Sequence, residues 1–209
     1  MLYDAGKNLP DQITMPAPTP STLHQQLRLA TKEPHHALDH HPLMARLLAP
    51  DVSRDEYGDA LAAMHGIYAT TEAALLTYLA RSPELFDYAS RRKLPALEAD
   101  LAALGRQAVA VTVPLPAIDG TGALFGMLYT LEGATLGGQF IAARLRQQGA
   151  GDLPMQFYTV YGEQVRPRWL AFLENAEQRC PSAEYPSAVA TAVALFEGIS
   201  RHLDTCRQP

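Results

Sequence analysis

The sequence predicts a single all-α domain, and three observations lead to this prediction. Apolar residues recur at helical spacing in several long segments, and no segment shows a convincing alternation at period two. The length of 209 residues suits one domain with a substantial core. Hydrophobic residues make up 47% of the chain and charged residues 19%, which is ordinary globular composition rather than that of a disordered chain.

Charge and cysteine content narrow the class of protein. The formal net charge of −5 argues against a general nucleic-acid binder, although a local basic patch for an anionic ligand remains compatible with it. Cys180 and Cys206 are late and widely spaced, so they do not form a disulfide framework, and we expect a reducing cytoplasmic setting. The N-terminus has no secretory pattern, and no stretch approaches the roughly 20 apolar residues that span a bilayer. We therefore expect a soluble protein without membrane or nucleic-acid partners.

The N-terminal region divides into a leader and a first helix. Residues 1–20 carry four prolines among small and polar residues, which predicts a flexible leader before a domain at 21–205. Ser21 or Thr22 can cap a helix. The apolar stripe of this helix contains Leu23, Leu27, Thr31, His35 and Leu38. Pro34 should kink the helix because its ring nitrogen cannot donate to the carbonyl group of Ala30.

Further helices follow in order. Ser53 and Glu56 have the spacing of a capping box at the start of a long amphipathic helix that ends near Leu79. Another helix begins at Ala89 or Ser90 and stops at Gly105. The β-branched stretch 108–120, broken by two prolines, favours a connecting loop over a strand. Helices are then predicted at 121–148, around 156–178, and at 187–205.

The predicted helix at 121–148 is unusual because of its glycines. Its five glycines are Gly122, Gly126, Gly133, Gly137 and Gly138. Each costs about 1 kcal/mol relative to alanine inside a helix, so several together suggest that something large approaches the backbone. One interpretation is close helix–helix packing. The other is a flat cofactor lying against bare backbone at Gly133 and Gly137, which share a face, with Gly138 beside them.

Four histidines crowd into residues 35–41, and one of them is a candidate metal ligand. His35 lies on the apolar stripe, whereas His36 and His40 face the other way. A histidine on an apolar face is more often a satisfied core residue than a ligand. Here Asp39 lies one turn later, where its carboxylate can accept the other ring N–H and fix the tautomer, as happens beside metal-bound imidazoles. His35 is therefore the preferred candidate.

Several segments resemble the haem oxygenase family. The segments, in order along the chain, are ATKEPHHALD (30–39), SRDEYGDALAAMHGIYATTEAAL (53–75), RKLPALEADLAALG (92–105), LEGATLGGQ (131–139), FYTVYGEQVRPRWLAFL (157–173) and ALFEGISRHL (194–203). The first is similar to the proximal-helix motif of the family, and the fourth to its distal glycine motif in the bacterial form. The similarity runs in order from residue 22 to about 203, which one short motif cannot supply.

The resemblance implies a fold, a reaction and its site. His35 would ligate the iron of haem b on the proximal side, and Gly133, Gly137 and Gly138 would line the distal side. Haem would act as both substrate and cofactor, and O2 and an external electron donor would convert it to biliverdin, carbon monoxide and ferrous iron. The donor would be ferredoxin or an NAD(P)H-dependent reductase, and a bilin-accepting protein is a further candidate partner.

Haem propionates need cations at the edge of the pocket. Arg28 and Lys32 lie two turns and one turn before His35 in the predicted helix. Arg166 and Arg168 lie where the resemblance, loose in this segment, places propionate contacts. The alternative interpretation is that all four are ordinary solvated surface charges.

The distal motif departs from the animal pattern at one position. Animal members carry an aspartate after the distal glycine, where it orders a water molecule, and this chain has Ala134. Thr135 is one candidate to hold that water, and the backbone carbonyl groups of Gly133 and Ala134 are another. The departure keeps open a haem-binding or haem-storage protein that does not turn its ligand over.

Proteins that bind no haem also use this helical scaffold. A di-iron site typically needs two ExxH elements, and the chain has one, Glu33–His36. Thiamin-degrading relatives need a nucleophilic cysteine, and neither cysteine lies in an evident catalytic setting. A transition metal bound at the surface by His36, His40 and His41 is a further possibility, although Pro42 breaks the helix there.

Overall fold

The described part of the chain consists of α-helices, short 3-10 turns and loops. The structure is a computed structural model that describes residues 21–107 and 113–206. The helices are α1 (Leu23–Ala30), α2 (Lys32–Asp39), α3 (Pro42–Leu47), α4 (Arg54–Leu79), α5 (Leu94–Ala103), α6 (Thr121–Gln147), α7 (Val165–Arg179) and α8 (Tyr185–Thr205). Single 3-10 turns occur at Ala89–Arg91, Gly162–Gln164 and Ser182–Glu184. No strand occurs among the described residues, so the all-α prediction is confirmed; the leader at 1–20 lies outside them.

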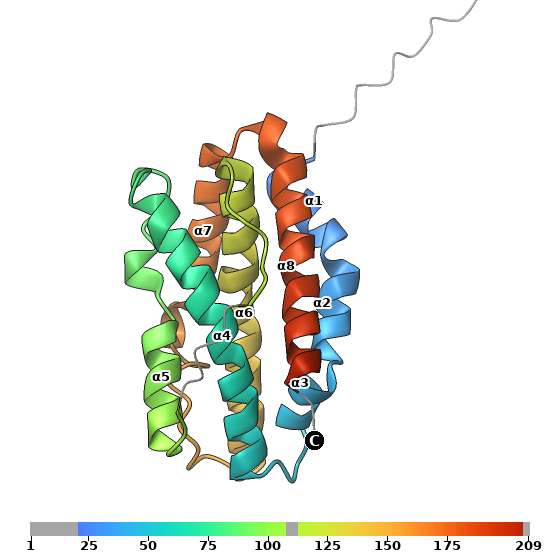
Figure 1. The fold of residues 1–209 in the computed structure, drawn as a ribbon, viewed down its shortest axis with the longest axis vertical. Coiled ribbons are helices and arrows are strands. Elements are labelled where there is room, and N and C mark those ends of the chain that lie inside the picture. The colour runs from blue at the N-terminus through green and yellow to red at the C-terminus, as the bar shows by residue number, and fades with distance from the viewer. Residues whose placement is uncertain (1–20, 108–112, 207–209) are drawn as a thin grey trace, which may run out of the picture.

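Three long helices form the centre of the molecule. Helices α6 and α8 lie side by side and run in the same direction, and α4 runs in the opposite direction (Figure 1). Helix α5 lies against α4, α7 lies against α6, and the chain from α1 to α3 runs along α8 (Figure 1). Leu61, Leu128 and Leu195, one from each long helix, are completely buried. The core therefore lies between α4, α6 and α8, and the remaining helices cover it.

The helix boundaries that depend on capping residues are confirmed. Thr22 caps α1, and Gln25 completes a capping box. Ser53 and Glu56 form the predicted capping box at the start of α4. Gly105 adopts φ = 69° just beyond α5, a conformation that favours glycine, and Arg106 N–H donates back to the carbonyl group of Leu101.

The helix break near Pro34 is also confirmed. Helix α1 ends at Ala30, Thr31 forms a turn, and α2 begins at Lys32. Thr31 N–H donates to the carbonyl group of Leu27, and His35 N–H donates to that of Thr31. The break therefore coincides with the bond that Pro34, which has no N–H, cannot donate to the carbonyl group of Ala30.

Two predicted helix starts are wrong. The helix expected from residue 89 or 90 begins at Leu94, because the chain extends at Arg92 and the buried Glu72 carboxylate accepts from the backbone N–H groups of Lys93 and Leu94. The helix expected from about 156 begins at Val165. The preceding residues form turns, because the Asp100 carboxylate accepts from the backbone N–H groups of residues 156 and 157.

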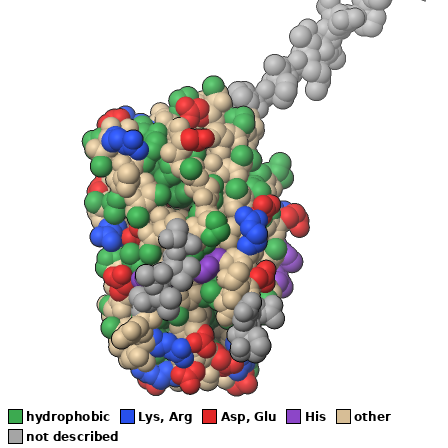
Figure 2. All heavy atoms as spheres, in the orientation of Figure 1, with side chains coloured by type: hydrophobic (Ala, Val, Ile, Leu, Met, Phe, Trp, Pro, Cys, Tyr) green, Lys and Arg blue, Asp and Glu red, His purple; other side chains and the backbone are tan. Residues whose placement is uncertain are grey.

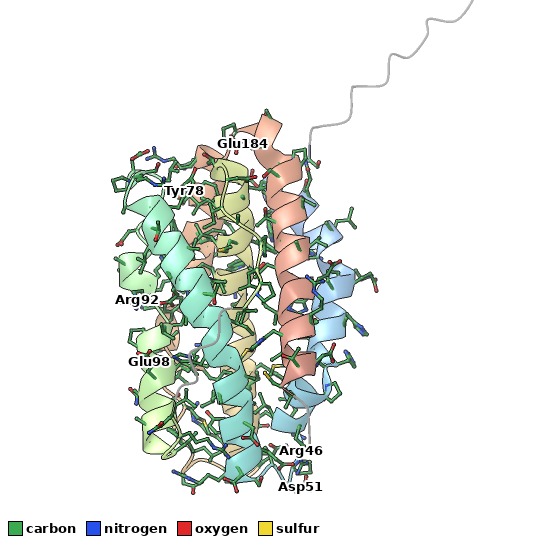
Figure 3. All side chains as sticks on the ribbon, in the orientation of Figure 1. Arg46, Asp51, Tyr78, Arg92, Glu98 and Glu184 are labelled. Atoms are coloured by element: carbon green, nitrogen blue, oxygen red, sulfur yellow. The ribbon has the colours of Figure 1, made fainter. Side chains whose placement is uncertain are left out.

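Charged side chains join neighbouring segments at the two ends of the bundle. Arg46 donates to Asp51 and Glu56, which ties α3 to the start of α4 (Figure 3). At the opposite end, Glu184 accepts from the backbone N–H of Gly122 in the first turn of α6 (Figure 3). These contacts fix where α4 and α6 begin. No helix in the described ranges is long and apolar enough to cross a membrane.

Candidate functional site

His35 lies on α2 with its ring held by a carboxylate. Its Nδ1 is 3.0 Å from Asp39 Oδ2 one turn later. Because Nδ1–H donates to Asp39, the lone pair of the neutral ring is on Nε2, and within residues 21–107 and 113–206 this atom has no hydrogen-bond partner. The predicted carboxylate contact, typical of a metal-bound imidazole, is therefore present, and Nε2 is available to a ligand.

The surroundings of His35 differ from the expected buried stripe. Leu23 and Leu27 are buried, but the His35 side chain is 59% exposed. The break at Thr31 separates the stripe into two helices, and α2 buries none of its residues. The His35 ring lies edge-on to the Phe196 ring from α8, with 5.5 Å between centroids. Helix α2 thus presents an open face that a ligand can cover.

Helix α6 has an equally open face in its second half. Leu136 and Phe140 are 40% and 62% exposed, which is uncommon for large apolar side chains. They share a helical face with Gly133 and Gly137, since these residues are spaced by three or four positions. A Cβ atom built on Gly137 would meet no atom within 4 Å.

The two open faces lie at the same level of the bundle. Tyr129 of α6 contacts the side chain of Thr31, and its ring lies 6.3 Å from that of His24. His35 is one turn beyond Thr31, and Gly133 is one turn beyond Tyr129. The chain through α1 and α2 runs in the same direction as α6 (Figure 1). The shared contact therefore brings His35 and Gly133 to a common depth.

The glycines of α6 face different neighbours. A Cβ atom on Gly122 or Gly126 would lie 2.4 Å and 2.2 Å from backbone oxygen atoms of Glu184 and Ala188. One on Gly138 would lie 3.1 Å from the carbonyl oxygen of Tyr158. Close packing, the plainer of the two interpretations, thus explains these three glycines, and the structure does not bring the predicted Gly138 to the open face. A Cβ atom on Gly133 would lie 3.6 Å from the Trp169 ring, which is an ordinary van der Waals distance.

The two residues after Gly133 point in different directions. Ala134 is exposed, so this position presents only a methyl group at the surface. Thr135 is buried, and its hydroxyl group donates to the carbonyl group of Glu132 at 2.6 Å. The structure therefore does not bring Thr135 to the open face, and the backbone is left to hold a water molecule there.

The predicted propionate-binding cations divide into two groups. Arg28, Lys32 and Arg166 are exposed, and they form no ion pair within the described residues. Arg168 donates to the carbonyl group of Ser90 at 3.1 Å, and its guanidinium group lies 4.7 Å from the centre of the Tyr161 ring. Arg168 thus lines a separate surface hollow together with Phe86 and Arg91. Its part in propionate binding stays a prediction.

The alternative metal and cysteine sites find little geometric support. Figure 2 shows histidines at the edge formed by α2, where the His36 and His40 rings stack with centroids 4.1 Å apart. His41 is buried, caps α3 and bonds Asp204. In the ranges that the structure describes, no three His, Cys, Asp or Glu side chains are arranged to hold a metal ion. Burial raises the pKa of the Cys180 thiol to about 11, which disfavours a nucleophilic thiolate.

Several residues of the site were absent from the sequence-based prediction. Leu136 and Phe140 repeat at the helical spacing of Gly133, so periodicity was a usable signal for them. Phe196 and Trp169 come from α8 and α7, and nothing local in the sequence relates them to His35 or Gly133.

Comparison with known proteins identifies the family that this all-α fold and its histidine–glycine site define. The model of the family described as "Heme oxygenase" matches residues 21–200. A curated relative, the heme oxygenase of Xanthomonas campestris pv. campestris, is 34% identical over 164 residues, which cover 78% of this chain and 96% of the relative. The chain therefore belongs to the heme oxygenase family.

Solved structures agree with the fold. The heme oxygenase of Leptospira interrogans matches with a TM-score of 0.71 at 16% identity, over 88% of this chain and all of that one. Heme oxygenase-1 from the cyanobacterium Synechocystis sp. PCC6803, solved in complex with heme, also matches with a TM-score of 0.71. The identity is 15%, over 90% of this chain and 93% of that one.

Proposed function

We propose that the protein binds haem between the His35 face of α2 and the face of α6 that carries Gly133, Leu136, Gly137 and Phe140, and degrades it with O2 and electrons. The products would be biliverdin, carbon monoxide and ferrous iron. Membership of the heme oxygenase family supports haem degradation by this chain. The residues present fit haem as the substrate, since a ring nitrogen, an open apolar face and nearby cations occur together.

The observation that carries the proposal is the orientation of His35. The hydrogen bond to Asp39 leaves Nε2 as the free ring nitrogen, and neutral imidazole is a common axial ligand of haem iron. A carboxylate partner also raises the basicity of a ligating imidazole and limits its rotation. His35 would thus ligate the haem iron through Nε2, with its own ring held in one orientation.

The α6 face provides the opposing wall. Leu136 and Phe140 expose apolar surface that a flat ring can cover, and covering it is favourable at about 25 cal/mol per Å². Gly137 allows the ring to approach the helix backbone, since no side chain intervenes. Both effects exclude water from the distal side of the ring.

Haem supplies its own iron for the activation of O2, so the protein contributes binding, orientation and proton placement. Arg28 and Lys32 extend from the helix pair that carries His35 and are the cations placed to bind the propionates. On the distal side Ala134 provides no acid. The carbonyl oxygen atoms of Gly133 and Ala134 are the groups that would accept from an ordered water molecule, which would then deliver protons.

The reaction needs electrons from outside the chain. We propose ferredoxin or an NAD(P)H-dependent reductase as the donor, and a bilin-accepting protein as a partner for the product. The family supports a reductase as donor in general terms.

Haem binding and turnover are tested separately. Haemin added to the purified protein should give a Soret band, and ascorbate, or ferredoxin with its reductase, should convert that spectrum under air to the spectrum of biliverdin. His35→Ala should lose the axial-ligand spectrum. His36→Ala, which changes the neighbouring exposed histidine, should keep it.

Two outcomes contradict the proposal in different ways. If no Soret band forms, or if His35→Ala keeps an unchanged axial-ligand spectrum, the site is wrong. If the haem spectrum persists after a reductant is added, the protein is a haem-binding or haem-storage protein, the alternative that Ala134 favours.

A further inference from the structure

We infer that Glu132 is a positioning residue for haem degradation: its buried carboxylate fixes the rotation of α6, and with it the direction of the Gly133 and Gly137 face proposed to cover haem. The inference rests on the proposed function, which it deepens. Glu132 immediately precedes Gly133 and its side chain is fully buried. A buried carboxylate is costly unless it is paired and hydrogen-bonded, so its partners matter.

Three side chains from outside α6 bind this carboxylate. Arg91 Nη1 donates to Oε2 at 2.7 Å, Lys93 Nζ donates to Oε1, and the Tyr161 hydroxyl lies 2.9 Å from Oε1. Arg91 and Lys93 come from the segment before α5, and Tyr161 comes from the segment before α7. Glu132 therefore ties α6 to two separate parts of the chain.

The segment that presents Lys93 is itself fixed. The Glu72 carboxylate of α4 accepts from the backbone N–H groups of Lys93 and Leu94 at 2.6 Å and 3.1 Å, and from Arg92 Nε at 3.1 Å. The Lys93 ammonium group also lies 4.8 Å from the centre of the Tyr88 ring. Burial lowers the pKa of Lys93, and Glu132 opposes that change. The anchor is thus rigid on both sides.

A rigid anchor at Glu132 determines where Gly133 points. Neighbouring residues of an α-helix are about 100° apart around its axis and about 1.5 Å apart along it. A rotation or shift of α6 that moved the Gly133 face would have to break charge-assisted hydrogen bonds inside the core. The hydrogen bond from the Thr135 hydroxyl to the carbonyl group of Glu132 lies in the same turn of the helix.

The anchor is significant because Gly133, Ala134 and Gly137 offer no polar side chain of their own to bind a partner. Ala134 has no polar side-chain atom, and Gly133 and Gly137 present only backbone. Together with the seating of the propionates, the position of the α6 backbone would then set which meso carbon of haem is closest to O2. Small displacements of reacting groups slow a reaction strongly, since a displacement of about 1 Å can lower the rate a hundredfold.

The test compares two anchor variants with a matched control. Glu132→Gln removes the charge, and Tyr161→Phe removes one hydroxyl group and leaves the ion pairs in place. Asp100→Asn is the control, because Asp100 is equally buried and binds backbone N–H groups of residues 156 and 157 instead. For each protein we would measure amide hydrogen exchange of α6 without haem, the Kd for haemin, the kcat and KM of biliverdin formation, and the isomers of biliverdin formed.

The expected result is local to the second half of α6. In both anchor variants amides 133–138 should exchange at least about tenfold faster, while amides 123–128 keep their rates. The kcat should fall about tenfold or more at a nearly constant Kd for haemin, and a single biliverdin isomer should become a mixture. Asp100→Asn should lower Tm and leave kcat and isomer composition unchanged.

Unchanged exchange at 133–138 together with an unchanged isomer in Tyr161→Phe would overturn the inference, and this variant decides the matter if Glu132→Gln does not fold. An equal isomer mixture in Asp100→Asn would overturn it as well. If the wild-type protein forms no biliverdin, the proposed function fails, and amide exchange still decides whether Glu132 fixes α6.

Discussion

Each half of α6 carries a pair of glycines four residues apart, and the two pairs have different neighbours. Gly122 and Gly126 in the first half allow α8 to approach until backbone meets backbone. Gly137 in the second half faces open space, with Leu136 and Phe140 exposed beside it. Spacing alone does not separate a glycine that packs against protein from one that faces a ligand. The neighbouring elements separate them, because Gly122 and Gly126 pack against Glu184 and Ala188 whereas a Cβ atom on Gly137 would meet no atom within 4 Å.

The largest effect should follow substitution in the packed half. Gly126→Ala would place Cβ 2.2 Å from the carbonyl oxygen of Ala188, and that oxygen belongs to backbone that cannot rotate away. We expect a loss of about 3 kcal/mol in the free energy of unfolding. This corresponds to a decrease of roughly 10 °C in Tm for a domain of this size. Thermal unfolding followed by circular dichroism measures it, and an unchanged Tm would mean that α6 and α8 are not in backbone contact.

A large side chain in the open half should affect binding instead of stability. Gly137→Leu adds a side chain where a built Cβ meets nothing within 4 Å, so the Tm of the haem-free protein should not fall below the wild-type value. The same side chain would occupy the space proposed for haem. We expect the Kd for haemin to increase at least about a hundredfold, because overpacking a filled site costs several kcal/mol. Titration of the Soret absorbance measures the Kd, and haem affinity equal to wild type would place the haem elsewhere.

The difference between the halves also shows what the sequence can and cannot predict. Caps at Thr22, Ser53 and Gly105 act within a few residues, and their helix boundaries were predictable. The start of α5 was not, because the group that sets it is Glu72, about 20 residues away in the chain. Local chemistry is visible in the sequence, and partners brought together by folding are not.

The site follows the same rule. The His35–Asp39 pair was predictable because both residues lie on one helix turn. The burial of Gly138 against Tyr158, and the Arg168 contact with Ser90, depend on packing between distant segments. The family resemblance located the helix that carries the glycines, and the structure was needed to determine which of its faces is open.

An intermediate effect should follow a change in the wall opposite α6. Asp39→Asn keeps the shape of the side chain and removes the negative charge that orients the His35 ring. Loss of such a partner typically costs 10–100-fold in metal affinity or activity, and the partial exposure of the pair favours the lower limit, about tenfold in the Kd for haemin. The matched control is Glu33→Gln, which removes another exposed carboxylate from the same helix. Equal affinities in the two variants would mean that Asp39 does not orient the ligand.

The smallest predicted effect has the opposite sign to the first. Gly137→Ala makes the same chemical change as Gly126→Ala, but the new methyl group meets no atom within 4 Å. Alanine restricts the unfolded chain and favours the helix, so the free energy of unfolding should increase by about 0.5–1 kcal/mol. Urea unfolding of the haem-free protein at constant m-value measures it. The Kd for haemin provides a second measurement. The methyl group lies on the face proposed for haem, so the stabilised variant should bind haemin more weakly than wild type. A variant that is both more stable and equally tight in binding would show that the open half of α6 is ordinary solvent-exposed surface.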